Sequence, residues 1–288
     1  MPRISYINGR YVNHSDANVH IEDRGYVFSD AIYEVMAFYN QKLLDSDLHI
    51  ERLYRSLKEL KINFTPSKQS IIIIIRELIE RNKRIDGTIY LQISRGVARR
   101  DHPFPKNAKP SLVMMITGAK SPKKIEVENG VGVITQPDIR WGRRDIKSVS
   151  LLANVLAKQE AALAGVREAW LIDENNFITE GAVSNNAIIN AKGEIITHPL
   201  NNNILGGVTR NVVLRLAKNN GIKVIERAFS LKEALAAKEA FLTSTTSNIL
   251  PVVSINGAKI ASGKRGDITK KLQELYSEHV LKETGKKL

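Results

Sequence analysis

The stretch RRDIKSVSLLANVLAKQEA, residues 143–161, places Lys147 just ahead of an apolar run rich in alanine and leucine. Further along the chain, ITEGAVSN (178–185) supplies Glu180. A lysine amine forms a Schiff base with an aldehyde once it has lost its proton, which burial or a neighbouring cation favours. Two arginines stand a few residues before Lys147 and supply such cations. The segment therefore indicates a reactive lysine, although one lysine among many is more often a surface residue.

The composition is that of a globular protein. The chain has 288 residues, 43% of them hydrophobic, and can hold two modest domains or one large one. It has no cysteine, which excludes disulfides and thiolate metal sites, and we expect no metal. The N-terminal residues show no secretory signal, and the isoleucine run at 71–75 is too short to cross a bilayer. We expect a cytoplasmic protein with no membrane partner.

The net charge is +13, which raises the possibility of a nucleic-acid partner. The basic residues are spread over KSPKK (120–124), RELIERNKR (76–84) and KETGKK (282–287), and aromatic residues do not interleave with them. This distribution favours a solvated basic surface, so we expect no nucleic-acid partner. A positive field would also attract an anionic substrate and an anionic cofactor.

The expected elements mix strands and helices without strict strand–helix alternation, which indicates the α+β class. We expect helices near 47–60, 67–82, 149–165, 208–221 and 267–283, and buried strands at 88–97 and 111–119. The polar segment KSPKKIEVENG suggests a boundary between domains. We therefore expect a small N-terminal α+β domain over 1–120, a linker over 121–130 and a large C-terminal cofactor-binding domain over 131–288.

Two further segments could hold a phosphate group. ILGGVTRNVVLRLA (204–217) carries a Gly-Gly turn into a helix, and the N–H groups of a helix N-terminus bind anions. LTSTTSNILP (242–251) supplies a cluster of hydroxyls on what we expect to be a loop. A carboxylate such as Glu180, expected on a short turn, could hold a protonated pyridine nitrogen. Together with Lys147, these features predict a pyridoxal 5'-phosphate site.

As a set, EDRGYVFSDAIYEV, HIERL, DIKS, ITEGAVSN, GGVTR and TSTTSNILPV resemble the motifs of the class IV aminotransferases, which are fold-type IV pyridoxal phosphate enzymes. The resemblance implies a small N-terminal α/β sandwich domain, a larger C-terminal pseudo-barrel domain and a bound pyridoxal 5'-phosphate. It makes Lys147 the Schiff-base lysine and proton shuttle. The cofactor contacts that it implies are Glu180 at the pyridine nitrogen, Leu205 against the ring, and Arg52, Val208, Thr209 and Thr245 at the phosphate.

SRGVARRDHPFP (94–105) resembles the Arg-x-His element with which the D-amino-acid transaminases of this family hold the substrate carboxylate. The resemblance assigns Arg100, His102 and Tyr33 to that carboxylate, and a guanidinium suits it because it can donate two parallel hydrogen bonds. In this family the second subunit donates the loop, which implies a homodimer. The implied reaction is a ping-pong exchange in which D-alanine and 2-oxoglutarate give pyruvate and D-glutamate.

Several alternatives stay open at this stage. A branched-chain L-amino-acid transaminase and an aminodeoxychorismate lyase share the lysine and the glutamate. Arg99, instead of Arg100, could hold the carboxylate, and the whole segment could be a solvated basic loop. Ala182 and Val183 stand where the family has serines and cannot donate side-chain hydrogen bonds to the cofactor.

Overall fold

The structure is a computed structural model that describes residues 3–119 and 121–288. It divides into two compact units. Unit 1 comprises Met1–Lys120, Ile146–Ser150 and Val280–Lys286, and unit 2 comprises Ser121–Asp145, Leu151–His279 and Lys287–Leu288. The segment 146–150, which carries Lys147, thus belongs to unit 1, although we expected it in the large C-terminal domain. The segment 121–130, expected to be a linker, belongs to unit 2 and contains a helix.

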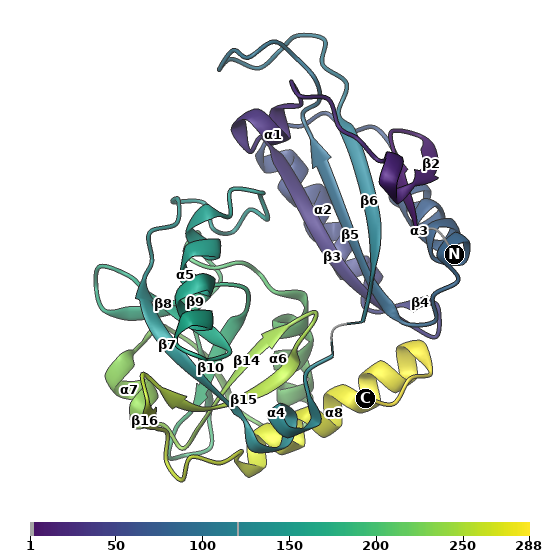
Figure 1. Ribbon diagram of the computed structural model, residues 1–288. Helices are drawn as coiled ribbons and strands as arrows, with labels where there is room; N and C mark the ends of the chain where they lie inside the picture. The colour runs from purple at the N-terminus through teal and green to yellow at the C-terminus, as the bar shows by residue number, and fades with distance from the viewer. Residues whose placement is uncertain (1–2, 120) are drawn as a thin grey trace. The chain divides into compact units, whose positions relative to one another are not determined.

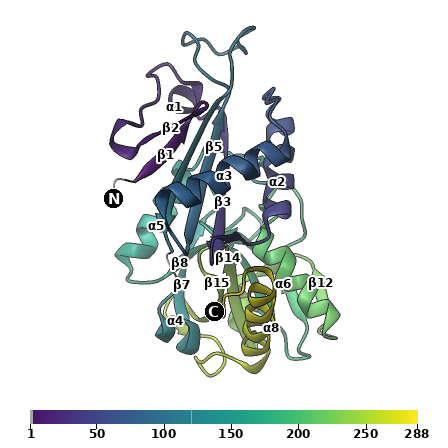
Figure 2. The same cartoon turned by 90° about the vertical axis from the view of Figure 1, so that its right-hand side faces the viewer.

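Unit 1 is an antiparallel sheet with helices on one face. The sheet has six strands in the order β2-β1-β6-β5-β3-β4. Figure 2 shows α2 and α3 against one face of the sheet. The elements are β1 (Ile4–Ile7), β2 (Arg10–Asn13), a 3-10 turn η1 (His14–Asp16), α1 (Arg24–Phe28), β3 (Ala31–Tyr39), β4 (Lys42–Leu43), α2 (Ser46–Glu59), α3 (Lys68–Asn82), β5 (Gly87–Ser94) and β6 (Ser111–Gly118).

The alternation of side chains along β3 decides which residues face the helices. Ile32, Met36 and Phe38 are fully buried and belong to one apolar core with Leu53 of α2. Because successive side chains of a strand point to opposite faces, the odd-numbered Tyr33 lies on the other face. Register pairs β3 with β5 along nearly its whole length and places Tyr33 opposite Gln92.

Unit 2 is built on a mixed sheet (Figure 1) with a main apolar core and a smaller apolar cluster between α5 and the sheet. Its strands follow the order β12-β11-β10-β14-β15-β7-β8-β9-β13, and β16 pairs with β15. The elements are α4 (Lys124–Asn129), β7 (Val131–Pro137), α5 (Leu152–Leu163), β8 (Glu168–Ile172), β9 (Phe177–Gly181), β10 (Asn185–Ile189), β11 (Ile195–Thr197), α6 (Val208–Asn219), β12 (Val224–Glu226), β13 (Phe229–Ser230), α7 (Leu231–Leu235), β14 (Glu239–Ser244), β15 (Asn248–Ile255), β16 (Ala258–Lys259) and α8 (Asp267–Thr284).

The α+β class predicted from the sequence is confirmed, and so are the expected helices to within a few residues. Ser67 caps α3 by accepting a hydrogen bond from the N–H of Ser70. The expected loop over 242–251 is instead largely strand, because β14 and β15 pair antiparallel on either side of a tight turn. Among the described residues, no helix combines the length and the apolar character needed to cross a membrane.

We predict that Leu53→Ala lowers the free energy of unfolding by about 2–5 kcal/mol, because the change leaves a cavity between α2 and the sheet. Leu53 is 0% exposed. Ile73→Ala on α3 is the control, since Ile73 is 65% exposed and its truncation removes little packing. Urea denaturation followed by circular dichroism measures both. Equal midpoints for the two variants would contradict the assignment of Leu53 to the core.

Candidate functional site

Lys147 lies in a short segment that is bound to the edge of β3 in unit 1. The N–H of Tyr33 donates to the carbonyl of Lys147 (2.9 Å), and the N–H of Val149 donates to the carbonyl of Ala31 (3.1 Å). The N–H of Lys147 donates to Oγ of Ser56 on α2 (3.3 Å). The amine Nζ of Lys147 lies 4.2 Å from the centre of the Tyr33 ring. The structure therefore brings together two of the predicted site residues, Lys147 and Tyr33.

The guanidinium of Arg52 is held by a buried carboxylate that the sequence analysis missed. Nε and Nη2 of Arg52 donate to the two oxygens of Glu34 at 2.7 and 2.8 Å. Nδ1 of His49 lies 2.8 Å from Oε2 of Glu34. The Glu34 side chain is 0% exposed and that of Arg52 is 10% exposed. A glutamate at an inward position of β3, between Ile32 and Met36, was the available signal, because a buried charge needs a partner.

These contacts also decide the ionisation of Glu34. Burial raises the pKa of Glu34, but the charge of Arg52 and the hydrogen bonds from Arg52 and His49 outweigh it and lower the pKa from 4.5 to about 2. Burial lowers the pKa of His49 below its ordinary value. A neutral His49 therefore donates Nδ1–H to the Glu34 carboxylate, and α2 is fixed to β3 by two donor side chains, Arg52 and His49, on one anion.

Glu180 lies in unit 2 inside strand β9, not on the short turn that we expected, and only 4% of the residue is exposed. Arg140 forms an ion pair with Oε1 of Glu180. Oε2 accepts hydrogen bonds from Nδ2 of Asn185 (2.8 Å) and from the N–H of Leu205 (3.1 Å). Burial raises the pKa of Glu180 above its ordinary value, and Arg140 offsets this only in part. A second cation beside this carboxylate would stabilise its charged form.

Arg140 is the second site residue that the sequence analysis missed. Its Nε and Nη2 donate to the two oxygens of Asp138 at 2.9 and 2.8 Å, and the hydroxyl of Thr179 donates to Oδ2 of the same carboxylate (2.8 Å). Arg140 is thus clamped between Asp138 and Glu180. The sequence gives little sign of this role, because Arg140 is one basic residue in a run with Arg143 and Arg144.

The start of helix α6 has the open N–H groups of an anion site. Gly207 is the N-cap and supplies no side-chain cap, and the first helical residues, Val208 and Thr209, are both buried. A Cβ on Gly207 would lie 2.0 Å from Oδ1 of Asn185, so the loop runs tightly against β10. Leu205 lies in this loop, and its carbonyl accepts from Nδ2 of Asn185 (2.9 Å). The loop before α6 and Glu180 are thus joined through Asn185.

The remaining predicted residues lie near the ends of strands or on a loop. Thr245 is half-buried in the turn between β14 and β15. Arg100 and His102 are exposed on the loop after β5 and both lie near the Phe28 ring, with Cζ of Arg100 and the His102 ring centre 5.4 and 5.3 Å from its centre. The segment is not a wholly solvated basic loop, because Arg95 is only 7% exposed.

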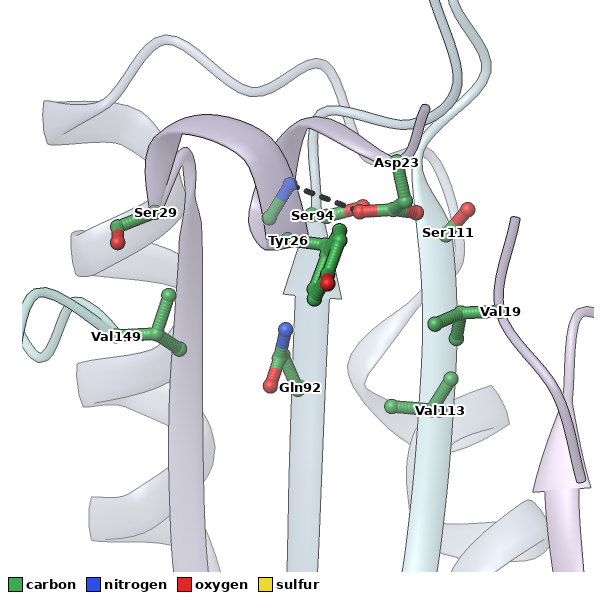
Figure 3. A pocket seen from close by; sticks show the side chains of 10 residues that line it. Val19, Asp23, Tyr26, Ser29, Gln92, Ser94, Ser111, Val113 and Val149 are labelled. Atoms are coloured by element: carbon green, nitrogen blue, oxygen red, sulfur yellow. Dashed lines mark hydrogen bonds between the residues drawn. The ribbon is translucent and has the colours of Figure 1, made fainter. Parts of the chain in front are cut away.

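A cavity of about 350 Å³ opens on the sheet face of unit 1 that carries Tyr33. Figure 3 shows Gln92 and Tyr26 at its centre, with Val149 on one side and Val113 on the other. Gln92 is the register partner of Tyr33, and Val149 follows Lys147 by two residues. The cavity therefore adjoins the segment that carries Lys147 and has mixed apolar and polar walls.

We predict that the free energy of unfolding falls as pH falls from about 4.5 towards 2, because protonation of Glu34 breaks its contacts with Arg52 and His49. The pKa of Glu34 is lowered by folding, so its contribution is present above the ordinary pKa and is lost below it. Glu34→Gln should be less stable at neutral pH and should lose less stability over this range. Urea titrations at a series of pH values measure both.

Glu77→Gln is the control for that comparison, because Glu77 forms an ion pair with Arg81 on α3 but is 40% exposed. Exposed pairs contribute little to stability, so its pH profile should match that of the unchanged protein. A Glu34→Gln profile that also matches it would show that Glu34 carries no linked proton.

Comparison with known proteins agrees with the fold and with the motifs. Residues 31–255 match the family model described as amino-transferase class IV. A D-alanine aminotransferase of Bacillus licheniformis is 42% identical over 279 residues, covering 97% of this chain and 98% of that protein. A D-alanine aminotransferase of Staphylococcus epidermidis is 39% identical over 275 residues, covering 96% and 97%.

Solved structures share the fold at lower identity. The Escherichia coli branched-chain amino acid aminotransferase superposes with a TM-score of 0.90 at 24% identity, covering 99% of this chain and 96% of that one. The branched-chain amino acid aminotransferase of Thermobaculum terrenum, solved in its PLP form, gives a TM-score of 0.84 at 23% identity, covering 99% and 95%. The expected fold type IV is confirmed by these likenesses. From its motifs, its fold and its full-length relatives, the chain belongs to the class IV aminotransferases.

Proposed function

We propose that this protein is a pyridoxal phosphate-dependent D-amino-acid transaminase that converts D-alanine and 2-oxoglutarate to pyruvate and D-glutamate. The observation that carries the proposal is the placement of the Lys147 amine against the Tyr33 ring, beside a cavity on the same sheet face. The substrate class is supported by the full-length relatives, which are D-alanine aminotransferases at 38–42% identity.

The residues present fit the cofactor. When bound, pyridoxal 5'-phosphate supplies an aldehyde for the amine and a ring that accepts electrons from the substrate. Glu180 would hold the pyridine nitrogen, since the buried carboxylate has an environment that an added cation would improve. Leu205 would pack against the ring. The N–H groups of Val208 and Thr209, the Arg52 guanidinium and the Thr245 hydroxyl are assigned to the phosphate, and an uncapped helix N-terminus favours that anion.

Lys147 is assigned the proton transfer. Its Nζ would take the proton from the substrate α-carbon and return it at the adjacent cofactor carbon, acting first as a base and then as an acid. The hydrogen bonds between Lys147 and β3 fix its backbone, so the side chain alone moves between these positions. The aromatic face of Tyr33 attracts the amine when it carries a proton, which keeps it near the substrate between the two transfers.

Tyr33, Arg100 and His102 are assigned to the substrate carboxylate. A guanidinium gives a bidentate contact, and an imidazole and a phenol add donors. Holding the carboxylate on one side decides which face of the α-carbon presents its hydrogen to Lys147, and this selects D-amino acids. The exposure of Arg100 and His102 in one chain agrees with a loop that serves the site of a second subunit.

The branched-chain L-amino-acid transaminase remains the second candidate, because the solved structures with the same fold include such enzymes. At 24% identity they show the fold alone, whereas the relatives at 38% identity or above are D-alanine aminotransferases. An aminodeoxychorismate lyase would release pyruvate over many turnovers without any keto-acid acceptor, so an assay that omits 2-oxoglutarate separates it from a transaminase.

We predict that the protein loaded with pyridoxal phosphate loses its visible cofactor band on addition of D-alanine but keeps it with L-leucine. The reason is that amino transfer would leave the cofactor as an amine, without a C=N bond conjugated to its ring. Lys147→Ala should lose nearly all turnover, by a factor of roughly 10⁶ or more for an essential covalent group. Bleaching by L-leucine alone would replace the D-specific assignment with the L-specific one.

The exposed face of helix α5 supports the homodimer. Leu152, Val155, Leu156 and Leu163 recur at helical spacing and are each more than half exposed, at 73%, 58%, 52% and 72%. An apolar stripe of this kind on a helix is typical of a protein interface. We infer that a second copy of the chain covers it, since the exposed Arg100 and His102 loop also needs a second copy for the proposed carboxylate contact.

We predict that Leu156→Arg converts the dimer to a monomer in sedimentation equilibrium, because a charge cannot be buried without a partner. The monomer should retain its helical content but lose turnover at low D-alanine. Ile73→Arg on α3 is the matched control, since Ile73 is a single exposed isoleucine, and it should leave both properties unchanged. A Leu156→Arg protein that sediments as a dimer would place the interface elsewhere.

A further inference from the structure

The buried guanidinium of Arg24 donates hydrogen bonds to the backbone of the loop that carries Arg100 and His102. Arg24 is the first residue of α1 and is 4% exposed. Its Nη1 donates to the carbonyl of Asp101, and its Nη2 donates to the carbonyl of His102 (3.2 Å). The two carbonyls thus belong to the residue between Arg100 and His102 and to His102 itself. One guanidinium therefore fixes the backbone between the two side chains assigned to the substrate.

Arg24 is paired with a carboxylate inside unit 1, and it shares that carboxylate with a second arginine. Its Nε donates to Oδ2 of Asp30 (2.9 Å), and Asp30 also binds Nε and Nη2 of Arg95 at 2.7 and 2.9 Å. Burial raises the pKa of Asp30, but the hydrogen bonds from Arg95 and Arg24 outweigh it, so the pKa lies below its ordinary value. Asp30 is therefore an anion shared by two guanidiniums.

Arg95 fixes the start of the same loop. It donates to the carbonyls of Lys61 (2.9 Å) and Leu60 (2.7 Å), which lie just past the end of α2. Its Cζ lies 3.6 Å from the centre of the Phe104 ring, further along the loop. Contacts of Arg95 and Phe104 thus fix the loop before Arg100 and after His102, although the two side chains between them are exposed.

The Phe28 ring contacts the side chains of both Arg100 and His102. Phe28, at the end of α1, also lies close to Arg24, whose Cζ is 4.7 Å from the ring centre. Arg100 and His102 contact the same ring at 5.4 and 5.3 Å. These contacts with one ring restrict the rotamers open to Arg100 and His102, although both side chains are exposed.

Resting on the proposed function, we propose that Arg24 is a positioning residue for the substrate carboxylate, which acts by presetting Arg100 and His102 through the loop backbone and Phe28. Because Arg24 is buried and its Nε, Nη1 and Nη2 already donate to Asp30 and to the two loop carbonyls, the Arg24 guanidinium is not the group that binds substrate. It removes the cost of ordering the loop when substrate arrives, and preorganisation of this kind improves affinity more than it changes the chemical step.

The test is Arg24→Lys in the holoenzyme. Lysine keeps the charge and can contact Asp30, but one ammonium cannot reach both carbonyls. We expect KM to rise roughly 10-fold or more for D-alanine and for 2-oxoglutarate, since both carry the carboxylate, while kcat stays within about 2-fold. The visible cofactor band and the affinity for pyridoxal phosphate should not change. A fall in kcat with unchanged KM would overturn the proposal.

A double-mutant cycle with Arg100→Ala shows whether Arg24 acts through Arg100. If it does, Arg24→Lys should raise KM much less in the Arg100→Ala background than in the unchanged protein. Fully additive effects would overturn the proposal. Phe28→Leu is an independent variant that keeps the Arg24 contacts with the loop backbone, and it should raise KM in the same direction without changing kcat. An unchanged KM in this variant would overturn the part of the proposal that runs through the ring.

Arg81→Lys is the matched control. Arg81 also pairs with a carboxylate (Glu77, 2.6 Å) and lies on an aromatic ring (Tyr11, 4.4 Å), but on α3 and its neighbouring strand. The KM values of the Arg81→Lys variant for D-alanine and for 2-oxoglutarate should match those of the unchanged protein. If the unchanged protein does not act on D-alanine, the proposed function fails, and this inference fails with it. If Arg100→Ala raises KM and Arg24→Lys does not, this inference alone fails.

Discussion

Carboxylates that are shared between several cationic or polar groups hold three of the site segments: the helix of Arg52, the loop of Arg100 and His102, and the strand of Glu180. Asp30 binds two guanidiniums, Glu34 binds a guanidinium and an imidazole, and Asp138 and Glu180 bind Arg140 between them. Removal of one partner would leave a buried charge uncompensated, at a cost of several kcal/mol. Each charged group therefore depends on its partner. This mutual dependence fixes geometry more than it adds stability. These contacts orient the Arg52 guanidinium, the loop that carries Arg100 and His102, and the strand that carries Glu180.

Each unit carries residues that are assigned to the proposed reaction. Unit 1 carries the Lys147 amine, the arginine assigned to the phosphate and the residues assigned to the substrate carboxylate. Unit 2 carries the carboxylate assigned to the pyridine nitrogen and the N-terminus of α6. The segment 146–150 is the exception in chain order, because it leaves unit 2 to hydrogen-bond with β3 and then returns. That excursion places Lys147 beside Tyr33, which lies far earlier in the chain.

The sequence predicts local features well and buried pairs poorly. The caps, the Gly-Gly turn and the apolar spacing predicted α3, α6 and α8, because those signals lie within a few residues of each element. The motifs also selected Lys147, Glu180 and the start of α6. Arg140 and Arg95 were missed, because Glu180 and Asp30 lie 40 and 65 residues from them. Asp138 lies only two residues before Arg140, but a nearby carboxylate does not distinguish a buried arginine from a solvated one. For the same reason Glu180 was expected on a short turn, because only its distant partner Arg140 makes a buried strand position tolerable for a carboxylate.

The two glycines before α6 are under unequal steric constraint. A methyl group on Gly206 would have Leu200 Cδ2, at 3.8 Å, as its nearest neighbour, so alanine fits at this position without a clash. A methyl group on Gly207 would displace the Asn185 amide, which contacts both Glu180 and the carbonyl of Leu205. Glycine at residue 207 thus preserves two features at once, the uncapped N-terminus of α6 and the orientation of the Glu180 carboxylate. Among homologues, a side chain at 207 should therefore occur only together with a smaller residue at 185.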